Sequence, residues 1–299
     1  MMASIAETAW EAGRFDARRG PSELLFGRMH EDSSIEARAF RPGGRIFCIA
    51  SAGCTAMELS RHHEVVAVDV NPVQIAYARS RFSGGRASRG AAERLMGYAR
   101  ALGPAVGWRR SRLREFLDLD DPSAQLAFWR AHLDTWRFRR AMDLLLSRPV
   151  LGLVYAKPFL RCLPRHFGRV LRGRMERCFG AHSNRRNPYA RALLLGELAQ
   201  APPPPEATRI RLLHSDAAAF LEREPSGTFD GFALSNVLDA ASEDYRRRLS
   251  AAVRRAAAPE AVVVVRSFSE PSDATGANFA AGDRSILWGI VEVKPAAAL

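Results

Sequence analysis

The segment from Arg45 to Gln74 constrains the fold more than any other part of the chain. It begins with a short apolar run, residues 46–50, which is typical of a strand buried on both faces. A turn of small residues, a short helical segment and a second apolar run, residues 65–70, follow. This order predicts a βαβ unit. The separation between Gly53 in the turn and Asp69 in the second strand is close to the roughly 20 residues at which nucleotide-binding units place a carboxylate on ribose hydroxyls.

The turn differs from the one that binds dinucleotides. Gly53 is its only glycine, and Cys54 and Ala56 stand where further glycines are usual. A pyrophosphate needs more bare backbone, so the turn favours a smaller adenosine ligand. An ordinary parallel strand pair is the alternative. Asn71 followed by Pro72 favours the ligand site, because this pair starts a helix and adds hydrogen-bonding groups where a ribose would lie.

Further apolar runs predict the rest of a doubly wound, Rossmann-like α/β sheet. They cover residues 210–214, 229–234 and 262–265, and residues 285–293 alternate as expected for an antiparallel edge strand. Polar residues follow two of these runs: Ser215-Asp216, and Ser235-Asn236 with Asp239. The ligand crevice is expected at the carboxyl ends of the first and fourth strands.

A long basic segment separates the second strand from the third. Residues 81–200 hold 24 Lys and Arg against 9 Asp and Glu, a net charge of +15, so the rest of the chain is −3. Such a region favours anionic membranes, nucleic acid or phosphorylated substrates.

Two helices stand out in the basic segment. Residues 124–146 predict one amphipathic helix with a Trp/Leu stripe, more typical of a core than of a ligand site. A helix from Pro164 would carry Arg165, Arg169 and Arg172 on one face. That face could be solvated, grip a phosphate or lie on a membrane surface.

The sequence predicts three parts: residues 1–82, a basic helical insertion over residues 83–205, and residues 206–299. A helix is possible near residues 6–14 of the first part. Prolines 202–205 are expected to form an extended hinge. The four cysteines have no paired spacing, so neither disulfides nor a metal site is expected. No signal peptide is visible and no apolar run is long enough to span a bilayer, which predicts a cytoplasmic protein.

Three sequence stretches carry a resemblance to a known family: GRMHEDSSIE at 27–36, SAGCTAMEL at 51–59 and AVDVNPVQIAYA at 67–78. Together they resemble the betaine-lipid synthases, with lesser likeness at residues 187–189, 234–239 and 283–284. The resemblance implies a class I methyltransferase fold and S-adenosylmethionine as co-substrate. It further implies transfer of the 3-amino-3-carboxypropyl group to the hydroxyl of diacylglycerol, with release of methylthioadenosine.

The resemblance also implies the ligand contacts: Asp69 on the ribose, Asp216 near the adenine amino group, and the Gly53 turn beside the methionine part. The full predicted cofactor-binding set is Ser51, Gly53, Cys54, Asp69, Asn71, Gln74, Ser215, Asp216, Ser235 and Asn236. From chemistry alone, a strand-end carboxylate is as often a helix cap, and Asp216 could cap the helix that follows it.

Transfer to an alcohol calls for a general base. Asp239 is the predicted catalytic residue because it follows the fourth strand, where an acceptor would enter; His30 and His214 are weaker candidates, and His214 could instead be a core histidine. Ala240 follows Asp239, where lipid-making relatives carry an aromatic residue.

The expected partners are a hydroxyl-bearing lipid at an anionic inner membrane face, on which the protein would dock peripherally, and a separate N-methyltransferase. Nucleic acid is disfavoured as a partner. Two alternatives stay open: methyl transfer to a small molecule, lipid or RNA, and a non-catalytic binding protein.

Overall fold

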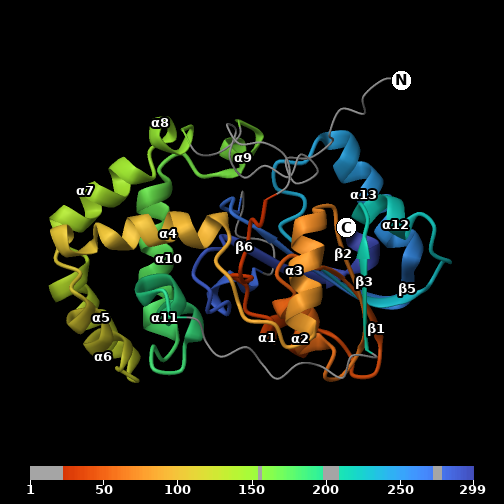
Figure 1. Ribbon diagram of the computed structural model, residues 1–299, viewed down its shortest axis with the longest axis horizontal. Helices are drawn as coiled ribbons and strands as arrows, with labels where there is room; N and C mark the ends of the chain where they lie inside the picture. The colour runs from red at the N-terminus through yellow and green to blue at the C-terminus, as the bar shows by residue number, and fades with distance from the viewer. Residues whose placement is uncertain (1–22, 154–156, 198–208, 272–277) are drawn as a thin grey trace.

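The computed structural model describes residues 23–153, 157–197, 209–271 and 278–299. Its centre is a six-stranded sheet with the strand order β3-β2-β1-β4-β5-β6. The strands are β1 (Arg45–Ile49), β2 (Glu64–Asp69), β3 (Ile210–His214), β4 (Phe229–Ser235), β5 (Ala257–Ser267) and β6 (Ile290–Pro295). The first five are parallel, and β6 pairs antiparallel with β5. The predicted doubly wound sheet is therefore confirmed (Figure 1).

Helices cover both faces of this sheet. They are α1 (Ser34–Ala39), α2 (Cys54–Leu59), α3 (Pro72–Phe82), α12 (Ala217–Leu221) and α13 (Glu243–Ala256). Side chains alternate across β1, so that Phe47 packs under α12 and α13 while Ile46 and Cys48 pack under α1, α2 and α3. Because every strand between the edges is covered on both sides, its apolar residues run almost without interruption.

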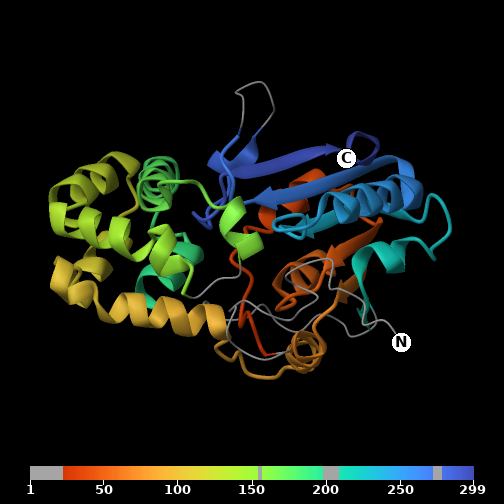
Figure 2. The same ribbon diagram turned by 90° about the horizontal axis from the view of Figure 1, so that it is seen from above.

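The basic segment forms a helical lobe beside the sheet (Figures 1 and 2). Its helices are α4 (Ala91–Ala101), α5 (Arg110–Leu117), α6 (Pro122–Phe128), α7 (Trp136–Leu145), α8 (Arg148–Leu151), α9 (Lys157–Cys162), α10 (Phe167–Ala181) and α11 (Pro188–Leu195). Trp129, Phe116 and Phe179 are the largest side chains of the lobe's own core. In the parts of the chain that the structure describes, no helix is long and apolar enough to cross a membrane.

Short turns of other helix types complete the elements: η1 (Gly103–Val106), the π-helical η2 (Trp129–Leu133), η3 (Phe279–Ala281) and η4 (Ala296–Ala298).

The prediction of a single helix over residues 124–146 is wrong. The π turn at Trp129–Leu133 ends α6, and the Thr135 hydroxyl accepts a hydrogen bond from the Phe138 amide to start α7. The widened turn and the break let Trp129 and Leu133 enter the core, whereas Trp136 is 66% exposed. The predicted stripe is therefore a core stripe only in its first half.

Other element ends also differ from prediction. The helix expected from Pro164 begins at Phe167, so Arg165 lies outside it, and Arg172 pairs with Asp143 of α7 at 2.7 Å. The last strand begins at Ile290 rather than at residue 285. The possible helix at residues 6–14, the hinge at 202–205 and the boundary at 205/206 lie outside the described residues.

A buried arginine ties the sheet to the segments around it. Arg266 of β5 is fully buried, and its guanidinium contacts the Glu36 carboxylate of α1 and the Asp283 carboxylate, the latter at 3.0 Å. It also donates a hydrogen bond to the Asp32 carbonyl at 3.1 Å. Glu36 is thus a counter-ion of this arginine.

We expect Arg266→Met to lower the free energy of unfolding by about 3–5 kcal/mol at pH 8, because it leaves buried carboxylates without a counter-ion. Those carboxylates then take up protons more readily in the folded state than in the unfolded state, so the loss should shrink as pH falls toward 5.5. Urea unfolding at both pH values measures this.

Arg41→Met is the control, because Arg41 and Glu260 form an exposed ion pair that should contribute little. Equal effects of the two substitutions would contradict the structural importance of Arg266.

Candidate active site

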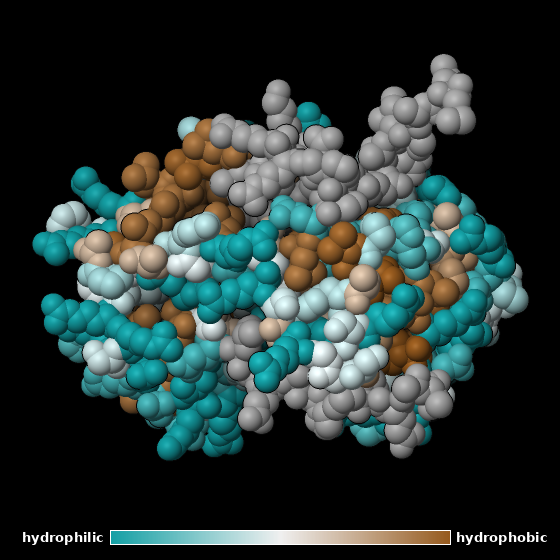
Figure 3. All heavy atoms as spheres, viewed as in Figure 1, coloured by the Kyte–Doolittle hydropathy of each residue, from teal (hydrophilic) through white to brown (hydrophobic). Residues whose placement is uncertain are grey.

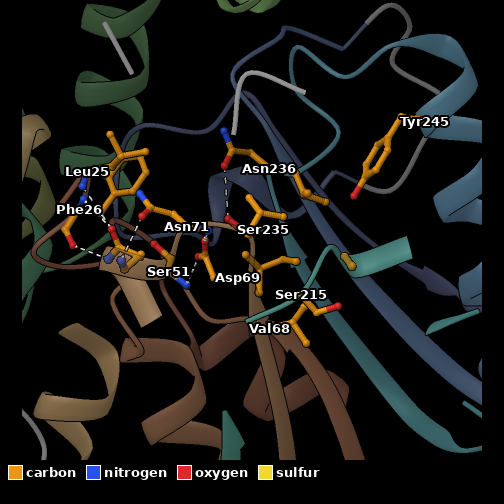
Figure 4. A pocket seen from close by; sticks show the side chains of 15 residues that line it. Leu25, Phe26, Ser51, Val68, Asp69, Asn71, Ser215, Ser235, Asn236 and Tyr245 are labelled. Atoms are coloured by element: carbon orange, nitrogen blue, oxygen red, sulfur yellow. Dashed lines mark hydrogen bonds between the residues drawn. The ribbon is translucent and has the colours of Figure 1, made fainter. Parts of the chain in front are cut away.

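A cavity, here called the strand-end cavity, lies at the carboxyl ends of β1, β2 and β4 (Figure 4). Both polar and apolar side chains line it. Asp69 and Ser51 lie side by side at its centre, with Leu25 and Phe26 on one side and Tyr245 on the other. This is the position predicted for a ligand crevice, where the direction of winding reverses between β1 and β4.

Asp69 connects the ends of the two central strands. Its carboxylate accepts hydrogen bonds from the backbone amides of Ser51 and Asn71, both at 2.9 Å. Burial raises the pKa of Asp69 to about 6, despite these hydrogen bonds. A carboxylate oxygen can accept a second hydrogen bond, so the side chain can also receive ribose hydroxyls.

Asn71 and Gln74 line the cavity but hold a neighbouring segment of the chain. The Asn71 side chain caps α3 and donates to the Glu23 carbonyl at 2.8 Å. Gln74 donates to the Phe26 carbonyl at 2.8 Å and accepts from the amides of Leu25 and Phe26. These contacts fix Leu25 and Phe26 as a wall of the cavity.

Ser51, two residues after β1, and Ser235, the last residue of β4, have left-handed backbone conformations, with φ of 42° and 54°. Such conformations cost energy for residues other than glycine, and they cluster at functional sites. Ser215 and Asn236 also line the cavity, as predicted.

Three residues of the predicted cofactor-binding set do not line the cavity. Gly53, with φ of 81°, caps α2 where an added Cβ would meet the Phe82 ring at 2.6 Å. The Cys54 sulfur accepts a hydrogen bond from Arg81 at 3.0 Å. Asp216 accepts from the Ala219 amide and the Tyr245 hydroxyl, so it is a helix cap, the alternative considered from the sequence.

The three candidate bases lie apart. Asp239 is 4% exposed and accepts hydrogen bonds from the Ser267 hydroxyl and the Phe268 amide, outside the lining of the strand-end cavity and of the larger cavity described next. Burial raises its pKa, but its position gives no support to the predicted catalytic role. His214 is an exposed residue whose ring contacts the Val70 carbonyl, rather than a core histidine. His30 lines the larger cavity.

The larger cavity, here called the apolar cavity, has a volume of about 320 Å³ and extends into the helical lobe. Its walls are mainly Leu, Met, Phe and Trp side chains from α4, α7 and α10 and from the segment before β6. Four residues line both cavities and so form the junction between them: Phe26, Ser51, Ser235 and Asn236.

Few charged side chains line the apolar cavity. They are Arg28, His30, Glu31 and Arg100. Among the described residues, Arg28 Nε is buried without a hydrogen-bond partner, and its guanidinium lies over the Tyr189 ring at 5.7 Å. Because Arg28 also lines the apolar cavity, its guanidinium is a cation that an anionic group of a ligand could pair with. The described residues contain no group of His, Cys, Asp and Glu side chains arranged to hold a metal ion.

No protein-family model matches the chain, and no curated protein matches its sequence. Similar solved structures include a SAM-dependent methyltransferase from Aquifex aeolicus, at 11% identity and a TM-score of 0.34, covering 85% of this chain and 70% of that one. The [4+2]-cyclase SpnF matches at 12% identity and a TM-score of 0.35, covering 87% of this chain and 57% of that one. The rRNA methyltransferase AviRa from Streptomyces viridochromogenes matches at 12% identity and a TM-score of 0.32, covering 82% of this chain and 77% of that one. This chain thus spans less than two thirds of SpnF. The strand order, rather than these matches, establishes the fold.

We expect S-adenosylmethionine to bind less tightly as pH falls through about 6, because protonation of Asp69 removes an acceptor for ribose hydroxyls. Asp69→Asn should weaken binding roughly 10- to 100-fold at pH 8, the range for hydrogen bonds to a charged group, and should abolish this pH dependence. Titration calorimetry measures both.

Asp216→Asn is the matched control, since asparagine also caps helices and Asp216 does not line the cavity. Equal losses in the two variants, or binding to Asp69→Asn as tight as to the wild type, would refute the assignment of Asp69 to the ribose.

Proposed function

We propose that this protein transfers the 3-amino-3-carboxypropyl group of S-adenosylmethionine to the hydroxyl of an apolar acceptor, a diacylglycerol, and releases methylthioadenosine. The observation that carries the proposal is the junction of the strand-end cavity, which Asp69 lines, with the apolar cavity at Ser51, Ser235 and Asn236. An adenosine sulfonium and a lipid hydroxyl would meet at that junction.

The strand-end cavity suits the adenosine part of the co-substrate. It supplies the Asp69 carboxylate for ribose hydroxyls and apolar side chains, including Leu25 and Val68, for the adenine ring. Its volume is only about 70 Å³, below the roughly 300–1,000 Å³ of ordinary ligand pockets. The amino-acid arm would therefore extend through the junction toward the apolar cavity.

The apolar cavity suits a lipid better than a polar acceptor. Its volume of about 320 Å³ is within the range for ligand pockets, and a polar substrate would lose its hydration against Leu, Met and Phe side chains without new hydrogen bonds. This argues against RNA as the acceptor.

The carbon that is transferred depends on which electrophilic carbon of the sulfonium faces the hydroxyl. The Arg28 guanidinium, which lines the apolar cavity, would hold the carboxylate of the amino-acid arm inside that cavity. That position exposes the Cγ carbon to an acceptor there. The resemblance to betaine-lipid synthases supports the same choice.

The outer face of the lobe suits a membrane surface. Helix α7 lines the apolar cavity through Phe138, Ala141, Met142 and Leu145. Its opposite face exposes Trp136 and Leu144, each 66% exposed, with Arg140 between them. Hydrophobic residues gather over α7 and α8 at the upper left of Figure 3. An exposed Trp/Leu face with arginines is typical of helices that lie on anionic lipid.

Incubation with S-adenosylmethionine and vesicles that contain dioleoylglycerol should yield methylthioadenosine above the spontaneous background, as identified by mass spectrometry. S-adenosylhomocysteine would instead indicate methyl transfer. Binding of the co-substrate without either nucleoside would indicate a binding protein.

Ala141→Trp should reduce product formation at least tenfold without weakening S-adenosylmethionine binding, because the indole fills the acceptor cavity. Ala101→Trp, at an exposed alanine of α4 that does not line the cavity, is the matched control. Equal rates in both variants would contradict a lipid in this cavity.

The protein should co-sediment with vesicles that contain phosphatidylglycerol, and less so at high salt, because screening weakens surface charge attraction. Replacing both Trp136 and Leu144 with alanine should reduce binding several-fold. Phe279→Ala, which removes an exposed aromatic side chain outside α7, should not. Tight RNA binding without vesicle binding would instead favour an RNA-modifying enzyme.

A further inference from the structure

Glu31 is a buried carboxylate at the wall of the apolar cavity, close to its junction with the strand-end cavity. It is 6% exposed, and it lines the apolar cavity together with Ser51 and Ser235. The Ser235 hydroxyl, which lies at the junction, donates a hydrogen bond to the Glu31 carboxylate. A carboxylate here is within reach of an acceptor hydroxyl that approaches the junction from the apolar side.

The charges around Glu31 do not balance. Arg266 is the cation of a cluster that holds three carboxylates: Glu36 in direct contact, Asp283 at 3.0 Å and Glu31 at 3.6 Å. Glu36 and Asp283 both accept hydrogen bonds from the guanidinium, whereas Glu31 is the most distant of the three and the one that lines the apolar cavity. An added proton is therefore best accommodated on Glu31.

Residues on several strands and helices around Glu31 affect whether its carboxyl group is charged. The groups that act on Glu31 are Arg266 on β5, Glu36 on α1, Asp283 before β6, Ser235 on β4 and Cys48 on β1. Arg28 and His30 of its own segment line the same cavity. The pKa of Glu31 is raised to about 7. Burial is the largest cause and the charges of Glu36 and Asp283 add to it, while Arg266 and the Ser235 hydroxyl oppose the shift. The Cys48 thiol is neutral because burial raises its pKa. His30 is 3.4 Å from Glu93 and so has a carboxylate of its own.

We propose that Glu31, rather than Asp239, is the general base that accepts the proton of the acceptor hydroxyl. This role rests on the proposed function. The hydroxyl oxygen forms a bond to the Cγ carbon, and the carbon–sulfur bond breaks with its electron pair left on sulfur, which gives neutral methylthioadenosine. The hydroxyl proton passes to the Glu31 carboxylate and leaves for solvent before the next turnover. Arg266 holds the carboxylate, and Ser235 directs it toward the junction.

The test compares methylthioadenosine formation by the full chain and by Glu31→Gln, with S-adenosylmethionine and dioleoylglycerol vesicles. The amide preserves the shape of the side chain and can still accept from Ser235. Turnover should fall at least 100-fold, the lower end for loss of a general base, with S-adenosylmethionine affinity within threefold by calorimetry. Glu31→Asp, which keeps a carboxylate, should recover part of the rate.

The pH profile of the wild type gives a readout that needs no variant. Because the base must be ionised, turnover should rise about tenfold per pH unit below about 7 and level off above it. Glu36→Gln removes a charge that raises the pKa of Glu31, so it should move this limb to lower pH.

The outcomes separate the two proposals. Methylthioadenosine formation that persists in Glu31→Gln, or a wild-type rate that does not depend on pH between 5.5 and 8, would overturn the role of Glu31 alone. Absence of methylthioadenosine from the wild-type reaction, despite S-adenosylmethionine binding, would overturn the proposed transfer and this role with it.

Discussion

The burial of Arg266 is the interaction on which the arrangement around the strand ends depends. An unpaired guanidinium inside a protein is too costly, so this side chain needs carboxylates from other segments. Glu36 brings α1 to the sheet, Asp283 brings the segment before β6, and the Asp32 carbonyl fixes the chain between Glu31 and α1. The same contacts hold Glu31 against Ser235 at the edge of the apolar cavity.

The two halves of the molecule contribute different chemistry to the candidate site. Strand ends of the sheet present hydroxyl, amide and carboxylate groups, because parallel strands leave their carboxyl ends together at one edge. The helical lobe presents Leu, Met and Phe side chains, because its amphipathic helices turn apolar faces inward. Arg174 of α10 links the two halves: its buried guanidinium donates to the carbonyl of Phe268 at 2.7 Å and pairs with Glu270.

Many polar residues that look like ligand contacts in the sequence hold the protein's own backbone. Asn71 and Gln74 fasten the segment at Leu25 and Phe26, and Asp216 caps α12. Asp239 holds the chain after β5 through Ser267 and Phe268. This follows from the cost of an unpaired polar group near the core: buried backbone amides at strand ends take the nearest side-chain acceptors.

The sequence by itself determined the sheet and the place of the crevice. Apolar runs and turn residues act locally, so the strand at Ile46, the acid at Asp69 and the cap at Asn71 could be predicted. Tertiary structure decided which of these side chains line a cavity, because that depends on packing partners far away in the chain. No sequence pattern separates Glu31, whose carboxylate faces the apolar cavity, from Glu36, whose carboxylate pairs with Arg266. The break before α7 could not be predicted from the sequence either, because core packing of Trp129 and Leu133 overrides the local helical periodicity.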